Sequence, residues 1–429
     1  MSLQVAVRVD ADCRDGSPDA RLAASRDVLA PLGVDLREVD CLADAEGADL
    51  IVRVGSHPRP WFAAAGCLDV AEFADLEACL KILARDGLGE TLLRGRPREW
   101  RAAVAQRLGP LQSAARLYLF GGGLVGRQAA AMAAAYGVVP AGFLDNDASL
   151  HGGAVDGLAV LAPEDADLAG ATVVVCTGRH FAEITTQLWG LGAGGVLSLS
   201  EFSFLLGSPS FPEHDYFADL RRNRFRYVGL MARVADAPSR EVLAAVLWHR
   251  LTFATGPLRD VCSDDQWFIP EVFAARVDAL FVDGGAYDGD TGAEFIRRNG
   301  GVGHGVELFE PDPSLAERAQ RRMAGVPGAR VHRAGLSARP GVMQFASTGG
   351  MDGAIAGNCG ETINVLSVDG TVGPGVTYLK LDVEGAEEAA LQGARRAIAA
   401  AHPVVAVAVY HRAADLWRLP AWLDAHAHG

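Results

Sequence analysis

Three side chains that could do proton chemistry follow two apolar runs near the C-terminus. Asp382 ends the predicted strand 376–382, and Glu384 follows it. His411 comes directly after the predicted strand 404–410. In an open α/β sheet, ligands bind at the carboxyl ends of the strands, so we expect these side chains to line one site. A histidine titrates near neutral pH, and we therefore predict that His411 is a general base, with Asp382 and Glu384 beside it.

Other roles remain open for the same three residues. Asp382 and Glu384 precede or begin the predicted helix 386–398, where carboxylates complement the helix dipole. His411 could be a hydrogen-bonded histidine with no chemical role. All three could instead ligate a divalent metal, but no local ligand spacing demands one, and we predict a site without metal.

A glycine-rich turn follows the predicted strand 279–283. Gly284, Gly285 and Gly289 lie in it, and such glycines let the backbone approach a ligand with no Cβ in the way. Asp283 ends the strand, where its carboxylate could hold a cationic ammonium group. At the end of the next predicted strand, Glu310 could accept both hydroxyls of a ribose. Singly these could be ordinary turns and strand ends, but together they predict a nucleoside-containing ligand.

The first glycine loop of the chain lies earlier, between a predicted strand and a helix rich in alanine, and the loop after residue 283 is the second. Gly121, Gly123 and Gly126 give the full Gly-x-Gly-x-x-Gly pattern, and Asp145 follows Gly126 by nineteen residues. This arrangement is typical of a Rossmann-type site, with phosphate at the helix N-terminus and the acidic residue on a ribose. A scaffold with this loop but without a ligand is the alternative, because glycines also allow close helix–strand packing.

The elements that position these loops predict an α/β fold throughout. Strands and helices alternate in two successive stretches, which indicates parallel sheets. We expect a small α/β unit of unknown role at residues 1–110, a Rossmann-like nucleotide-binding domain at 111–205, a helical connector at 206–275 and a doubly wound domain at 276–429. The last has predicted strands at 279–283, 305–310, 330–333, 376–382 and 404–410.

The C-terminal part resembles the FkbM family of S-adenosylmethionine-dependent methyltransferases. The resemblance rests on residues 281–291 and 307–313 and on Tyr-Leu-Lys-Leu-Asp-Val-Glu-Gly-Ala-Glu at 378–387. It also rests on Val-Tyr-His at 409–411, Asp-Leu-Trp at 415–417 and Leu-Pro at 419–420. It implies a class I methyltransferase domain that methylates a hydroxyl of a sugar, glycan or polyketide-like acceptor. By the resemblance, Asp283, Gly285 and Glu310 bind S-adenosylmethionine, while Asp382, Glu384 and His411 face the reaction.

The complete expected cofactor site is a larger set around the same loop. It comprises Asp283, Gly284, Gly285, Tyr287, Gly289, Glu310, Asp312, Leu336, Ser337 and Asp382. Methyltransferases of this fold usually add two strands after the helix near Trp417, whereas six residues follow Leu423. We therefore expect a shortened sheet edge or a truncated chain.

The first glycine loop carries a second resemblance. Residues 142–147 and 155–161 resemble the N-terminal nucleotide-sugar-binding domain of sugar acetyltransferases. This implies that a nucleotide-sugar binds at residues 111–205.

Composition excludes several classes of partner. The formal net charge of −14 over 429 residues argues against a nucleic-acid or anionic membrane partner, since both need a basic face. No apolar run is long enough to span a bilayer, and the N-terminus lacks a signal pattern. Seven scattered cysteines without a Cys-x-x-Cys pair predict a reducing, cytoplasmic compartment.

Two other functions remain open from the sequence. One is a nicotinamide-dependent sugar-nucleotide oxidoreductase built on the first glycine loop, although neither a Tyr-x-x-x-Lys pair nor zinc ligands lie near it. The other is a non-catalytic nucleotide-sugar-binding module of glycan assembly.

Overall fold

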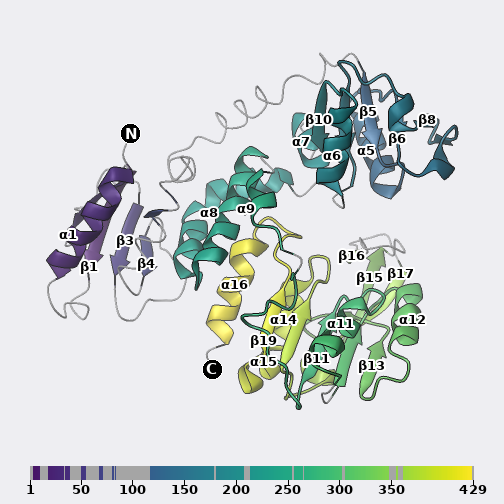
Figure 1. Cartoon of the computed structure of the whole chain (residues 1–429). Coiled ribbons are helices and arrows are strands. Elements are labelled where there is room, and N and C mark those ends of the chain that lie inside the picture. The colour runs from purple at the N-terminus through teal and green to yellow at the C-terminus, as the bar shows by residue number, and fades with distance from the viewer. Residues whose placement is uncertain are drawn as a thin grey trace. The chain divides into compact units, whose positions relative to one another are not determined.

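The computed structural model describes most of the chain and divides it into two compact units. The described residues are 3–9, 18–32, 34–38, 50–54, 67–70, 80–81, 83, 116–177, 180–206, 213–253, 256–263, 265–301, 305–346, 354–355 and 361–427. The N-terminal unit comprises residues 1–58 and 63–261, and the C-terminal unit comprises residues 59–62 and 262–429. Figure 1 shows both units with their elements labelled.

The N-terminal unit begins with a parallel four-stranded sheet. Its order is β2 (Val34–Glu38), β1 (Leu3–Val9), β3 (Leu50–Val54) and β4 (Cys67–Val70). Helix α1 (Pro18–Leu29) and the short η2 (Ala30–Leu32) connect β1 to β2. The α/β character predicted for this stretch is confirmed.

A six-stranded sheet follows, and it carries the first glycine loop. Its order is β10 (Gly195–Ser198), β9 (Thr172–Val175), β5 (Leu117–Phe120), β6 (Gly142–Leu144), β8 (Leu158–Leu161) and β7 (Ala154–Val155). All pairs are parallel except the β7–β8 hairpin. The helices are α5 (Leu124–Ala135), α6 (Phe181–Gly190) and α7 (Leu199–Leu206), with short η6 (Ala148–Leu150) and η7 (Pro163–Asp165). Two apolar clusters form its core.

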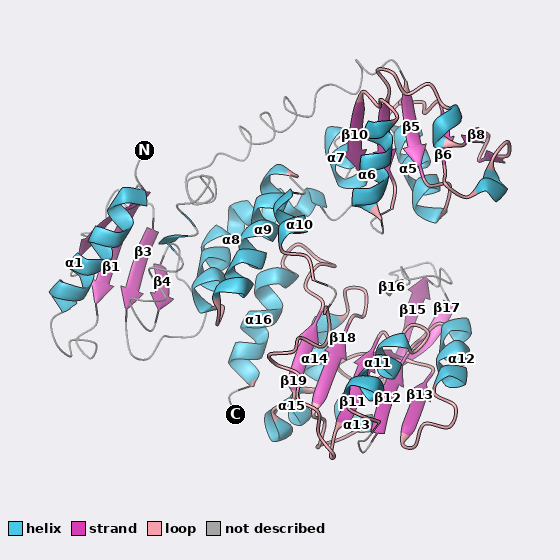
Figure 2. Ribbon diagram, viewed as in Figure 1, coloured by secondary structure: helices cyan, strands magenta, loops and turns pink. Residues whose placement is uncertain are grey.

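The segment that follows α7 in the N-terminal unit is mainly helical over its described residues. It contains α8 (Glu213–Arg233), α9 (Ala237–Thr252) and α10 (Gly256–Asp260), seen as cyan ribbons in Figure 2. Asp236 caps α9 by accepting a hydrogen bond from the amide of Ser239. Among the described helices of the chain, none is both long and apolar enough to cross a membrane.

The C-terminal unit is built on a parallel five-stranded sheet. Its order is β13 (Ala329–His332), β12 (Gly305–Phe309), β11 (Leu280–Gly284), β18 (Tyr378–Leu381) and β19 (Val404–Val407). The helices are α11 (Asp290–Arg298), α12 (Pro313–Arg322), α13 (Val368–Thr371), α14 (Glu387–Gly393), α15 (Arg395–Ala401) and α16 (Asp415–His426). All five strands predicted from the sequence are confirmed. The chain reverses direction across the sheet between β11 and β18, which makes this the topological switch point.

A second, smaller sheet was not predicted. Its order is β14 (Gly335–Leu336), β17 (Glu361–Leu366), β15 (Gly341–Ala346) and β16 (Ala354–Ile355). Only β14 and β17 are parallel, and the other pairs are antiparallel. The described residues of β15 are largely exposed and those of β17 alternate between buried and exposed, so neither gives the apolar run that marks a buried strand.

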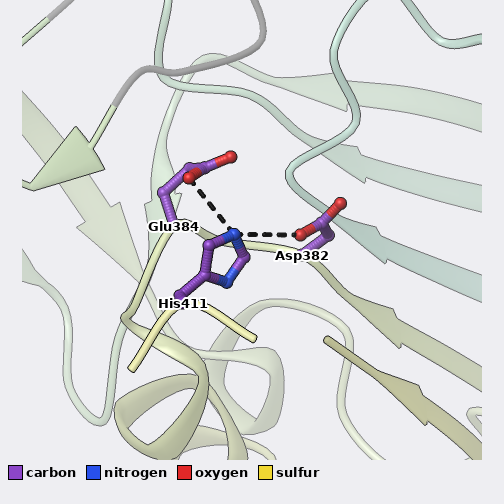
Figure 3. A group of neighbouring side chains, drawn as sticks. All are labelled: Asp382, Glu384 and His411. Atoms are coloured by element: carbon purple, nitrogen blue, oxygen red, sulfur yellow. Dashed lines mark ion pairs between the residues drawn. The ribbon is translucent and has the colours of Figure 1, made fainter. Parts of the chain in front are cut away.

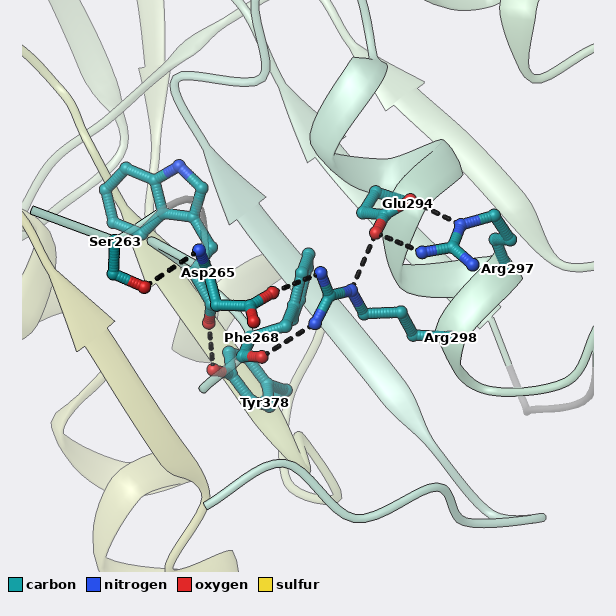
Figure 4. A network of polar contacts seen from close by, with 8 residues as sticks. Ser263, Asp265, Phe268, Glu294, Arg297, Arg298 and Tyr378 are labelled. Carbon is teal, nitrogen blue, oxygen red and sulfur yellow. Dashed lines mark hydrogen bonds and ion pairs between the residues drawn. The ribbon is translucent and has the colours of Figure 1, made fainter. Parts of the chain in front are cut away.

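An aromatic cluster fixes the base of β11. Phe281 and Phe295 stack with their ring centroids 4.5 Å apart, and Phe268 packs against both. Polar contacts hold the segment before β11 in place, as Figure 4 shows. Arg298 donates to the carbonyl of Phe268 at 2.9 Å and pairs with Asp265, while Tyr378 donates to the carbonyl of Trp267. Phe268 therefore forms part of the core that supports the second glycine loop, and the polar contacts around it hold residues 265–268 in place.

Candidate functional site

The ends of three neighbouring strands bring the predicted site residues to one edge of the sheet. β11 lies beside β18, and Leu381 at the end of β18 pairs with Val407 of β19. The glycine loop that follows β11 therefore lies next to the residues that follow β18 and β19. The predicted juxtaposition of these segments is confirmed.

The glycine loop lies against the backbone of the segment after β18. Gly285 has a φ of +74°, and a Cβ there would lie 1.8 Å from the carbonyl oxygen of Asp382. A side chain at Gly284 would lie 2.7 Å from Leu336 and 2.9 Å from Leu381. Tyr287 adopts a φ of +51°, which is uncommon for a residue with a Cβ. This backbone path requires glycine at 285 and leaves the amides of the loop free of bulky side chains.

Glu310 lies at the end of β12 and is held by the same loop. One carboxylate oxygen accepts a hydrogen bond from the amide of Tyr287 at 2.9 Å, and the other accepts one from the amide of Asp312 at 2.9 Å. Only 6% of Glu310 is exposed. Burial raises the pKa of Glu310 to about 7, although the two backbone hydrogen bonds oppose that shift.

The other predicted cofactor residues have structural roles that the geometry makes plain. Asp312 caps α12 by accepting from the amides of Ser314 and Leu315 at 2.8 and 3.1 Å. Leu336 is buried in the apolar core, directly below Gly284. Ser337 donates its amide to the carbonyl of Leu366 at 2.8 Å. Their predicted contacts with a cofactor stay predictions.

A buried ion pair joins β11 to β18 beneath the loop. Lys380 Nζ lies 2.9 Å from Asp283 Oδ1, with 3% and 0% of the two side chains exposed. The same ammonium donates to the carbonyl of Gly285 at 2.7 Å and lies 5.1 Å from the centre of the Trp267 ring. Burial raises the pKa of Asp283, and the charge of Lys380 opposes that shift. Asp283 thus has a cation within the chain, and its predicted contact with a ligand's ammonium stays a prediction.

The sequence singled out Lys380 only as a strand-end residue. Its partner could have been found from one signal, namely a lysine on the otherwise apolar strand Tyr-Leu-Lys-Leu beside a strand that ends in aspartate. A buried ammonium requires a partner, and the parallel pairing of β11 with β18 sets Asp283 directly opposite Lys380.

The three predicted catalytic residues lie together at the ends of β18 and β19 (Figure 3). His411 Nε2 lies 3.2 Å from Glu384 Oε2 and 3.5 Å from Asp382 Oδ1. The hydroxyl of Tyr410 donates to Asp382 Oδ1 at 3.0 Å. A fourth residue, Glu387, was not predicted: its Oε1 lies 2.9 Å from His411 Nδ1, and 1% of its side chain is exposed.

The charge around His411 changes the role expected of it. Burial lowers the pKa of His411, but the carboxylates of Glu384 and Glu387 outweigh it and raise that pKa to about 10. A ring with this pKa is protonated at neutral pH and cannot take up another proton. The sequence did not reveal the carboxylate of Glu387 beside the ring, and the role of His411 as the general base stays a prediction.

The first glycine loop connects β5 to α5, as predicted. A Cβ at Gly126 would lie 1.9 Å from the carbonyl oxygen of Gly121, so glycine is needed there for packing. Asp145, at the end of β6, accepts from the amides of Gly122 and Asp147, both at 2.9 Å. Gly121 and Gly123 have open space where a Cβ would lie. The structure brings the four predicted residues together around the loop and gives Asp145 a role in holding it.

The parallel sheets and the helices that connect their strands form a Rossmann-like fold. Residues 283–428 match the family described as "Methyltransferase FkbM domain". No curated protein matches the chain. Among solved structures, the chain is similar to the methyltransferase FkbM from Methylobacillus flagellatus KT. That likeness has a TM-score of 0.58 at 23% identity and covers 82% of this chain and 92% of the other. It therefore extends well beyond the residues that match the family.

The buried ion pair leads to a prediction about stability. Lys380→Met leaves the carboxylate of Asp283 buried without its cation, which should cost about 3–5 kcal/mol. Hydrogen–deuterium exchange should then speed up in peptides that cover β11 and β18. Adding Asp283→Asn should recover much of the loss, because both charges are then absent. Arg396→Met, which removes the exposed pair with Asp369, is the control and should change exchange little. Equal changes in hydrogen–deuterium exchange in Lys380→Met and Arg396→Met would contradict a stabilising role for the buried ion pair.

A second prediction concerns pH. An unfolded glutamate titrates near pH 4.3, and the folded pKa of Glu310 is about 7. The fold thus prefers the neutral carboxyl, so the contribution of Glu310 to the free energy of unfolding is greatest below about pH 4 and is lost as pH rises to about 7. Relative to the wild type, Glu310→Gln should become more stable across this range, by up to about 3 kcal/mol. Thermal unfolding without ligand at pH 4.5 and pH 7.5 measures the difference, and parallel profiles would refute it.

Proposed function

We propose that the C-terminal unit transfers a methyl group from S-adenosylmethionine to a hydroxyl group. One observation carries the proposal: the loop at Gly285 approaches the end of β18 at the switch point, and Glu310 lies buried at the end of the next strand. This is where open α/β sheets bind nucleosides. The match of residues 283–428 to a methyltransferase family supports the same chemistry.

The residues present fit this cofactor. Each oxygen of Glu310 accepts one backbone hydrogen bond and keeps a lone pair for a ribose hydroxyl. The turn at Gly285 lies so close to the carbonyl of Asp382 that no side chain fits there, which holds the loop at the end of β18. Gly284, Tyr287 and Gly289 belong to the same loop and would line the donor. When bound, S-adenosylmethionine supplies a methyl carbon on a positive sulfur, and the C–S bond breaks with its electron pair on sulfur as the new O–C bond forms.

The chain's own residues position the acceptor and receive its proton. Asp382 lies directly beside the loop, since its amide donates to the carbonyl of Gly284 at 3.0 Å. Its carboxylate can accept the hydrogen of the acceptor hydroxyl, with Tyr410 fixing one oxygen. We assign the proton acceptor to Asp382 in place of His411. The protonated ring of His411 holds Asp382 and Glu384 in position. Most of the rate acceleration then comes from holding the acceptor hydroxyl in line with the methyl group of the donor.

The acceptor class follows from the resemblance and from the N-terminal unit. A hydroxyl of a sugar, glycan or polyketide-like small molecule is the acceptor that we propose. Because the first glycine loop has a Rossmann-type arrangement, the N-terminal unit would hold a nucleotide-sugar. Such a chain would act in the cytoplasm, where nucleotide-linked sugars are made available to enzymes.

Donor binding tests the proposal. S-adenosylhomocysteine should bind to the whole chain in isothermal titration calorimetry. Gly285→Ala should weaken it by roughly 10-fold or more, since the loop must move away from Asp382, and Glu310→Gln should weaken it by about 10–100-fold through the lost charged hydrogen bonds. Gly341→Ala is the matched control, because a Cβ there makes only an ordinary contact at 3.9 Å with Val365. A wild-type chain that binds neither S-adenosylhomocysteine nor S-adenosylmethionine would refute the proposal.

Nucleotide-sugar binding at the first loop has its own test. Gly123 precedes α5 with a φ of −71° and open space at its Cβ, so Gly123→Asp fits the backbone and can cap the helix. Its charge would repel a phosphate at the same helix N-terminus. In calorimetry with a panel of nucleoside diphosphate sugars, the variant should bind roughly 10-fold more weakly or not at all, while Gly190→Asp, placed at an open position on α6, should bind normally. Equal binding by all three proteins, or none by the wild type, would contradict this role.

A further inference from the structure

The side chains around His411 carry more negative charge than the chain neutralises. Three carboxylates, those of Asp382, Glu384 and Glu387, lie within 3.5 Å of one imidazole. Among the described residues, neither Asp382 nor Glu384 makes an ion pair with a lysine or arginine. Even a protonated ring therefore leaves the cluster with a net negative charge. Such a group has a strong electrostatic preference for a further cation.

The imidazole of His411 is held by Glu387 from the side away from the other two carboxylates. Oε1 of Glu387 lies 2.9 Å from Nδ1, an ion-pair distance, and a carboxylate there favours a proton on Nδ1. This contact points Nε2 toward Asp382 and Glu384, as Figure 3 shows. A histidine that ligates a metal through one nitrogen commonly donates its other N–H to a carboxylate in this way.

The ring is buried and its Nε2 is poorly satisfied by the chain itself. The side chain of His411 is 10% exposed, and neither ring nitrogen makes a hydrogen bond of good geometry, although two carboxylate oxygens face Nε2 and one faces Nδ1. A buried polar atom without a hydrogen bond needs an explanation such as a missing ion. The Nε2 of His411 is thus aimed into the space between two carboxylates.

The spacing of the three atoms suits one metal ion. Their ligand atoms lie within 4.8 Å of one another, and Nε2 is 3.2 and 3.5 Å from the two oxygens. Two ligands that are each about 2.1 Å from a metal and about 90–110° apart lie about 3.0–3.4 Å from one another. The observed distances therefore need little rearrangement.

The backbone also holds Glu384 in an unusual conformation to reach this position. Glu384 has a φ of +54°, and Gly385 follows with a φ of +92°. Glu387 stabilises this turn, since its Oε1 accepts from the amides of Val383 at 2.9 Å and Gly385 at 3.3 Å. Left-handed conformations of non-glycine residues cluster at functional sites. One buried carboxylate thus orients both the histidine and the turn that carries Glu384.

We propose that Asp382, Glu384 and His411 bind a divalent transition-metal ion at the carboxyl end of the sheet, with Glu387 as the residue that positions His411. One nitrogen and two carboxylate oxygens favour ions such as Mn²⁺, Fe²⁺ or Zn²⁺ over the all-oxygen sets of Ca²⁺. The ion displaces the proton from Nε2, which passes to solvent, and two carboxylates then balance the charge of the ion beside a neutral ring. Three protein ligands leave positions for an acceptor hydroxyl, whose proton the ion makes easier to remove. The proposal deepens the proposed function but does not depend on donor binding.

Binding of Mn²⁺ tests the site directly. The whole chain, treated with a chelator and then freed of it, should bind one Mn²⁺ per chain, seen as loss of the free-ion signal in electron paramagnetic resonance. Glu384→Gln should weaken binding by roughly 10-fold or more, and His411→Ala should do the same. Glu388→Gln is the matched control: it makes the same substitution four residues away, where the carboxylate pairs with Arg418 on the surface, and it should bind as the wild type does.

Glu387→Gln separates the positioning role from ligation. It should also weaken Mn²⁺ binding by about 10–100-fold, because the ring loses the acceptor that fixes Nε2 toward the metal. Thermal unfolding with and without Mn²⁺ shows whether each variant is folded, since a bound ion raises the melting temperature of the folded protein. Glu384 is partly exposed, so its variant should fold even where that of Glu387 does not.

The outcomes are distinguishable from those of the donor experiment. A wild-type chain that binds S-adenosylhomocysteine but no Mn²⁺ would overturn the metal proposal and leave the proposed function intact. A wild-type chain that binds Mn²⁺ but neither S-adenosyl compound would refute the proposed function and leave the metal proposal intact. Metal binding that is unchanged in Glu384→Gln and His411→Ala would place the ion elsewhere and also overturn the proposal.

Discussion

The buried pair of Lys380 and Asp283 joins the two central strands at the point where the sheet changes direction. One ammonium neutralises the aspartate at the end of β11 and also holds the carbonyl of Gly285. A charge buried without such a partner would be costly, so the two strands must stay in register for either residue to be tolerated. The glycine loop, the Glu310 carboxylate that it holds and the segment after β18 all take their positions from this junction.

The same strand that carries Lys380 leads directly into the acidic cluster. Lys380 neutralises Asp283 beneath the loop, whereas Asp382, two residues later, faces His411 above it. Residues two apart on a strand point to the same face, but β18 ends at Leu381, so Asp382 lies in the segment beyond the strand and is not bound by its pleat. The two sets of charges therefore do different work: the first holds the fold, and the second is available to an acceptor or an ion. Glu387 supports the second set from the first turn of α14.

The sequence predicted the five strands of the C-terminal sheet because each is an apolar run that ends in a polar or glycine residue. It also placed Asp382, Glu384 and His411 together, since parallel strands end at one edge. It did not predict the small sheet, because the described residues of β15 are largely exposed and those of β17 alternate between buried and exposed. Nor could it place Glu387 against His411, because that contact depends on a left-handed turn at Glu384 and not on the spacing of the residues. For this reason the sequence could not show how many carboxylates surround the ring of His411.

The central claim is that the edge between Gly285 and Glu310 is the cofactor site. A crystal structure of the whole chain with S-adenosylhomocysteine tests it most directly. We expect density for the ribose with both of its hydroxyls at the carboxylate of Glu310. The homocysteine moiety should lie along the Gly285 loop, with its sulfur directed toward Asp382. Density for the ligand at the Gly121 loop, or a ribose that does not contact Glu310, would contradict the account.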